Sequence, residues 1–102
     1  ATKLVAARLL TAEAARAKES GQRADMLSGM AKLFASETAK EVCEDALRIH
    51  GCYGYISESP VERLYRGAPL FIFGEGTNDI QKIVIARRII DDSEVDVLGL
   101  PQ

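Results

Sequence analysis

The stretch from about residue 26 to residue 49 limits the possible folds most strongly, because its apolar side chains recur at intervals of three and four residues. Those positions are Met30, Leu33, Phe34, Thr38, Val42, Ala46 and Ile49, and charged residues fall mostly between them. A period of 3.6 residues predicts one long amphipathic helix and not a strand. Gly51 ends this helix, and His50 lies in its last turn as a capping or packing residue.

Three further segments are predicted to be helical. Residues 1 to about 20 are rich in alanine, which has the highest helix propensity and permits close approach of a neighbouring helix. A short helix is expected from Pro60 to about residue 66, with Ser59 as its N-cap, and a last one from Thr77 or Asn78 to about residue 90. The predicted fold is all-α, an incomplete up-and-down four-helix bundle of three main helices and one short helix.

The remaining segments complete the predicted organisation. The run Leu70–Phe73 is expected to be buried, as a strand-like or irregular segment too short for an independent sheet. Residues 1–92 are expected to form the bundle domain, and residues 93–102 a flexible acidic and apolar tail. The last helix is apolar on more than one side, so another helix or subunit is expected to cover it. The start at Ala1, without Met and already in helical pattern, suggests a larger protein.

Composition and charge exclude several classes of protein. The 102 residues are 47% hydrophobic and 27% charged, which argues against a disordered or collagen-like chain. The net charge of −2 provides no excess of positive charge for binding nucleic acid. The sequence contains no run of about 18 apolar residues, so no membrane span is predicted.

Cys43 and Cys52 lie nine residues apart and cannot form a zinc site with the lone His50. No metal is expected, and reduced thiols favour a cytoplasmic location.

Glu75 is the candidate for chemistry that the residues themselves indicate. It lies between Gly74 and Gly76, after an apolar run and directly before a helix. Glycines permit tight turns and the close approach of another molecule, and free N–H groups at Gly76, Thr77 and Asn78 favour an anion or phosphate. On this ground alone, two interpretations stay open: a catalytic base, or a solvated loop carboxylate beside a helix cap.

Four motifs, in this order and spacing, resemble the C-terminal helical domain of the acyl-CoA dehydrogenases, over residues 1 to about 90. They are Met30-Ala31-Lys32-Leu33-Phe34-Ala35-Ser36-Glu37, Ile49-His50-Gly51-Cys52-Tyr53-Gly54-Tyr55, Pro60-Val61-Glu62-Arg63-Leu64-Tyr65-Arg66 and Gly74-Glu75-Gly76-Thr77-Asn78-Asp79-Ile80-Gln81. The resemblance implies an FAD-dependent oxidoreductase that converts an acyl-CoA thioester to the trans-2-enoyl-CoA. It implies that Glu75 removes the α-proton while FAD accepts the β-hydride.

The resemblance also implies binding residues and partners. Gly76 would contact the substrate, and the residues expected near FAD are Thr77, Asn78, Asp79, Arg48, Ile49, His50, Gly51 and Cys52. A homodimer or tetramer is expected, with FAD at the subunit interface, electron-transferring flavoprotein as a possible partner, and the mitochondrial matrix as the location in a eukaryote. The 102 residues alone are expected to be inactive and to retain no FAD. The alternative is a stand-alone, non-catalytic helical association module in which Glu75 is vestigial.

Overall fold

The computed structural model describes residues 1–91, and all the regular secondary structure in that part of the chain is helical. The helices are α1 (Thr2–Glu19), α2 (Asp25–His50), α3 (Cys52–Tyr55), α4 (Pro60–Gly67), α5 (Leu70–Phe73) and α6 (Asn78–Asp91). The predicted all-α fold is therefore confirmed, with three long helices. The expected tail at residues 93–102 lies outside the described residues.

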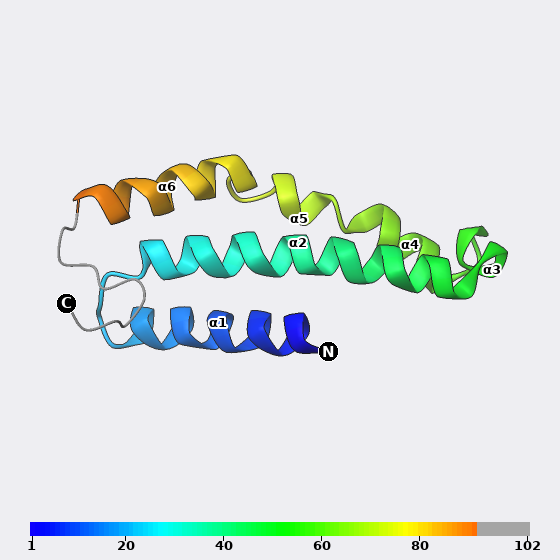
Figure 1. Cartoon of the computed structure of the whole chain (residues 1–102), viewed down its shortest axis with the longest axis horizontal. Coiled ribbons are helices and arrows are strands. Elements are labelled where there is room, and N and C mark those ends of the chain that lie inside the picture. The colour runs from blue at the N-terminus through cyan, green and yellow to red at the C-terminus, as the bar shows by residue number, and fades with distance from the viewer. Residues whose placement is uncertain (92–102) are drawn as a thin grey trace.

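Helix α2 is the axis of the molecule and contacts every other helix. Figure 1 shows α1 on one side of α2 and α4, α5 and α6 on the other, with α3 at the far end. Both α1 and α6 run antiparallel to α2, as an up-and-down bundle requires. The result is elongated, with extents of 52 × 24 × 24 Å.

Small residues allow the long helices to approach closely. The buried apolar side chains of α1 and α2 are all alanines, namely Ala7, Ala14, Ala17 and Ala31. Gly29 has the same role between α2 and α6, because a Cβ atom there would lie 3.1 Å from Gln81 Oε1 and 3.4 Å from Ile85 Cγ1. The close helix packing predicted from the alanine content is thus present.

Two short helices depart from the sequence prediction. Leu70–Phe73 forms the helical turn α5 and is not strand-like or irregular. Its large side chains are also not buried, since Leu70, Phe71 and Phe73 are 67%, 63% and 66% exposed. Pro69, with φ −58°, is already in helical geometry and directs the turn, and its carbonyl accepts a 3.0 Å hydrogen bond from the Ile72 N–H.

The other unpredicted helix, α3, follows a sharp change of direction at the end of α2. Gly51 has φ +57° and ψ −138°, a backbone conformation suited to glycine. The chain then turns back so that Gly54 is buried against α2, where an added Cβ would lie 3.0 Å from His50 Cβ. The two glycines thus redirect the chain from α2 towards α4.

Candidate active site

Glu75 lies in the short loop between α5 and α6 and has an unusual backbone conformation. Its φ is +55°, and Glu75 is the one non-glycine residue with positive φ among residues 1–91. Gly76 follows at φ +86°, and a Cβ atom there would lie only 2.8 Å from Gln81 Nε2. The same Gln81 amide donates a 3.4 Å hydrogen bond to the Glu75 carbonyl. The loop therefore presents the Glu75 side chain at a cost in backbone strain.

Thr77 caps the N-terminus of α6. Its Oγ1 accepts a hydrogen bond of 3.2 Å from the Ile80 N–H, and its carbonyl accepts one of 3.0 Å from the Gln81 N–H. The sequence suggested that this helix begins at Thr77 or Asn78, and Thr77 is the residue that caps it. Asn78 does not cap the helix with its side chain, which points into the molecule instead.

The Asn78 side chain is buried, with an exposed fraction of 3%, and bonds to α2 through both ends of its amide. Its Oδ1 accepts from Lys32 Nζ at 2.7 Å and from Ser36 Oγ at 3.2 Å. Its Nδ2 donates to Ser36 Oγ at 3.0 Å and to Glu37 Oε1 at 2.8 Å. This arrangement gives the Asn78 side chain a structural role, so the predicted contact with FAD would have to use its backbone.

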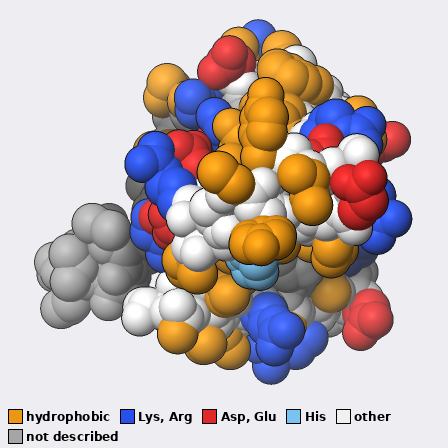
Figure 2. Space-filling model, turned by 90° about the vertical axis from the view of Figure 1, so that its right-hand side faces the viewer, with side chains coloured by type: hydrophobic (Ala, Val, Ile, Leu, Met, Phe, Trp, Pro, Cys, Tyr) orange, Lys and Arg blue, Asp and Glu red, His pale blue; other side chains and the backbone are white. Residues whose placement is uncertain are grey.

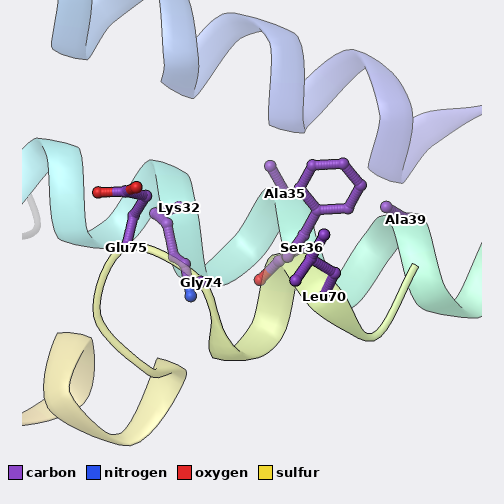
Figure 3. Close-up of a pocket in the computed structure, with 8 residues that line it drawn as sticks. Lys32, Ala35, Ser36, Ala39, Leu70, Gly74 and Glu75 are labelled. Atoms are coloured by element: carbon purple, nitrogen blue, oxygen red, sulfur yellow. The ribbon is translucent and has the colours of Figure 1, made fainter. Parts of the chain in front are cut away.

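A pocket of about 620 Å³ lies beside Glu75. It is lined by Lys32, Ala35, Ser36 and Ala39 from α2, Leu70 and Phe71 from α5, and Gly74 and Glu75 from the loop. In Figure 3 the Glu75 carboxylate lies at one end of the pocket and Ala39 at the other. The walls are mainly aliphatic and aromatic, while the Glu75 side chain itself remains exposed. A carboxylate at the end of an apolar pocket suits proton transfer to or from an apolar ligand.

Sequence reasoning did not assign Lys32 and Ser36 to the site, although both belong to a motif used for the resemblance. The available signal was their spacing, since residues four apart lie on the same face of a helix. Two polar side chains one turn apart on the packed side of α2 require polar partners, which Asn78 and the Ile72 carbonyl provide.

The second predicted group, Arg48 to Cys52, lies at the far end of α2. Figure 2 looks onto this end and shows apolar side chains around the histidine. Ile49 is 84% exposed, and His50 Nδ1 lies 2.8 Å from the Ala46 carbonyl oxygen, in agreement with the capping role predicted for His50. Fourteen residues separate Ser36 from His50, which is about 21 Å along a helix. The two groups of predicted site residues are therefore not brought together within this chain.

Arg48 is held by an ion pair along the same helix. Its Nη2 lies 2.7 Å from Glu44 Oε1. The hydrogen bond from Arg48, followed by the attraction of its charge, lowers the pKa of the Glu44 carboxyl below its ordinary value. The same hydrogen bond and charge raise the pKa of Arg48 above its ordinary value. Arg48 is therefore a fixed positive charge on an exposed surface next to Gly51.

Residues 1–90 match the family described as acyl-CoA dehydrogenase, C-terminal domain. The chain belongs to this family. The resemblance based on the four motifs is thus confirmed, and the acyl-CoA dehydrogenase C-terminal domain here includes all six helices up to about the end of α6.

Individual relatives of this acyl-CoA dehydrogenase domain carry the same fold within longer chains. Cyclohexane-1-carbonyl-CoA dehydrogenase of Geobacter metallireducens is 45% identical over 93 residues, 91% of this chain and 24% of that protein. The CarC subunit of the caffeyl-CoA reductase-Etf complex of Acetobacterium woodii is 44% identical over 90 residues, 88% of this chain and 24% of that protein. The solved structure of butyryl-CoA dehydrogenase from Megasphaera elsdenii has a TM-score of 0.86 and 36% identity, covering 87% of this chain and 23% of that one. The chain spans about a quarter of the length of the curated relatives that it matches.

The outward-facing groups of this acyl-CoA dehydrogenase domain have the chemistry to contact a dinucleotide such as FAD. Thr77 and Asp79 are exposed at the N-terminus of α6, where the first N–H groups of a helix have no intrahelical acceptor. Around Gly51 the backbone is open, because a Cβ atom there would meet nothing within 4 Å in residues 1–91.

Within the same residues, no three His, Cys, Asp or Glu side chains could share a metal ion, and no helix is long and apolar enough to span a membrane.

Proposed function

We propose that this chain is the C-terminal helical domain of a longer FAD-dependent acyl-CoA dehydrogenase, in which Glu75 removes the α-proton of an acyl-CoA thioester. The observation that carries the proposal is the strained backbone of Glu75, which directs a carboxylate to the end of an apolar pocket. Strained backbone conformations at non-glycine residues cost free energy and persist only where the surrounding structure enforces them. Such residues cluster at active sites.

The chemistry of the pocket fits the proposed substrate. An α-proton beside a thioester is only weakly acidic, so its base must be held at hydrogen-bonding distance, in a site that excludes water. Ala35, Ala39 and Leu70 offer apolar surface to an acyl chain. The backbone N–H groups of Glu75 and Gly76 donate no hydrogen bond within residues 1–91, and we propose that they stabilise negative charge on the thioester oxygen. Residues beyond this chain would have to complete the dry surroundings, because Glu75 is exposed here.

FAD, when bound, supplies the acceptor for the hydride of the β-carbon. The residues proposed to face it are Thr77, the Asn78 backbone and Asp79 beside the middle of α2, and the segment 48–52 at the C-terminal end of α2. Because these two groups are about 21 Å apart along α2, we assign them to different parts of one cofactor, or to two cofactors at a subunit interface. We propose the second arrangement, in which a homodimer or tetramer places FAD at the subunit interface.

The direction of the reaction and the electron carrier are also proposals. The relatives include both a dehydrogenase and a subunit of a reductase-Etf complex. The same carboxyl serves both directions, since Glu75 would take the α-proton in oxidation and return it in reduction. An electron-transferring flavoprotein is the proposed redox partner, and the cytoplasm or mitochondrial matrix the proposed location.

Replacement of Glu75 with Gln in the full-length protein tests this function. The amide keeps the size of the side chain but cannot accept the proton, so kcat should fall roughly 10²- to 10⁴-fold. FAD content and KM should remain close to wild type. Glu58→Gln, which alters another exposed loop carboxylate, is the matched control and should retain full activity. Normal turnover by Glu75→Gln would reject Glu75 as the base. Absence of turnover in the wild-type full-length protein would instead favour the non-catalytic association module.

A further inference from the structure

We propose that Lys32 is the positioning residue for Glu75, an inference that rests on the function proposed above for that carboxylate. Lys32 lies on α2, beneath the loop that carries Glu75, and lines the same pocket. It makes no ion pair with Glu75. Its ammonium group instead binds the chain on both sides of the loop.

The two hydrogen bonds of Lys32 enclose the catalytic loop. Nζ donates to the Ile72 carbonyl at 2.9 Å and to Asn78 Oδ1 at 2.7 Å. Ile72 lies three residues before Glu75, and Asn78 three residues after it. One side chain of the long central helix therefore fixes both the end of α5 and the start of α6. Hydrogen bonds from a charged donor are stronger than those between neutral groups.

Asn78 extends this anchor along α2. Its amide hydrogens are donated to Ser36 Oγ and Glu37 Oε1, at 3.0 and 2.8 Å. The first residue of α6 is thus tied to one and a half turns of α2, from Lys32 to Glu37. Asn78 is buried and all the hydrogen-bonding groups of its amide are used, so its side chain has little freedom to move. The start of α6 is therefore held in a fixed position relative to Lys32.

The loop needs such an anchor. Gly74 and Gly76 permit many backbone conformations, and Glu75 disfavours the one observed, with φ +55°. Within the loop itself, the Glu75 carbonyl is held by a long hydrogen bond of 3.4 Å from Gln81. Loss of the Lys32 bonds would release the Ile72 carbonyl and leave Asn78 held only by Ser36 and Glu37, and the carboxylate would then leave the geometry required for proton transfer.

Lys32→Met in the FAD-bound full-length protein tests the inference by two readouts. We expect kcat to fall roughly 10- to 100-fold, the loss typical of a displacement near 1 Å. KM should stay within about threefold, since the apolar pocket walls remain. Amide hydrogen exchange should quicken in peptides covering residues 72–78 and stay unchanged in α1. Lys40→Met, about two turns further along α2 and exposed, is the control and should change none of these quantities.

The outcomes separate this inference from the proposed function. If Glu75→Gln loses turnover while Lys32→Met keeps wild-type kcat and exchange, Lys32 is not a positioning residue and the function of Glu75 stands. If Glu75→Gln is fully active, the function fails, and the inference fails with it. If Lys32→Met does not fold or loses FAD, Asn78→Ala replaces it and should show the same losses in kcat and local protection. Wild-type values for Asn78→Ala would overturn the inference.

Discussion

Glu75 combines a side chain suited to catalysis with a backbone conformation suited to glycine. At φ +55°, an L-residue brings its Cβ close to the following carbonyl oxygen, at a cost of about 1–2 kcal/mol. The flanking glycines do not remove this cost, which belongs to residue 75 itself. The structure therefore predicts that stability and activity conflict at this position.

Comparison of Glu75→Gly with Glu75→Ala tests this strain. At an ordinary position glycine is less stable than alanine, because it loses more backbone entropy on folding. At position 75 the order should reverse, with Glu75→Gly more stable than Glu75→Ala by about 1 kcal/mol. Denaturant unfolding of the full-length protein measures the difference, and both variants should be inactive. The ordinary order, with alanine more stable, would show that residue 75 is not strained.

At the scale of the elements, the helices were predictable where their own residues determine them. The 3.6-residue period of α2, the alanines of α1 and the Ser59 cap of α4, which accepts a 3.2 Å hydrogen bond from the Val61 N–H, are local signals. The turn α5 was missed because an apolar run of four residues has no distinguishable period. The Lys32–Asn78 contact was missed because its partners are 46 residues apart and depend on how α2 meets α6.

The contact between α2 and α6 gives a prediction at the same scale. Gly29→Leu would push α6 away from α2, because a Cβ atom alone already lies 3.1 Å from Gln81 Oε1. We expect a loss of about 1–3 kcal/mol in unfolding free energy. Turnover should fall as well, since α6 begins beside the Glu75 loop. Gly67→Leu is the control, because a Cβ there meets nothing within 4 Å in residues 1–91. Equal stability of the two variants would contradict close packing at Gly29.

At the scale of the whole molecule, the described chain leaves much apolar surface uncovered. The buried apolar residues among residues 1–91 are five alanines, whereas Leu9, Ile90 and Tyr53 are among the large side chains that are exposed. This agrees with the excess apolar surface predicted from the last helix. The Glu75 carboxylate lies at the rim of a pocket whose walls are mainly apolar, so other parts of the full-length protein are expected to cover it.

We therefore expect the isolated chain to associate. Its 102 residues correspond to 11.1 kDa, and light scattering should give at least twice that mass, because contiguous apolar surface favours self-association. The purified chain should show no flavin absorbance, since the groups proposed to face FAD lie beside the middle of α2 and at its C-terminal end, and are not brought together within this chain. A stable monomer would contradict the first expectation, and a bound flavin the second.

The role of Glu75 can be measured most directly by exchange of the α-proton, separately from hydride transfer. An acyl-CoA analogue with sulfur in place of the β-carbon can lose its α-proton but has no β-hydride to transfer. Incubated in deuterated water with the full-length protein, the analogue should take up deuterium at the α-carbon much faster than it does free in solution. Glu75→Gln should reduce this rate to that of the free analogue, roughly 10²-fold or more below wild type. Exchange by Glu75→Gln at the wild-type rate would show that another group removes the proton.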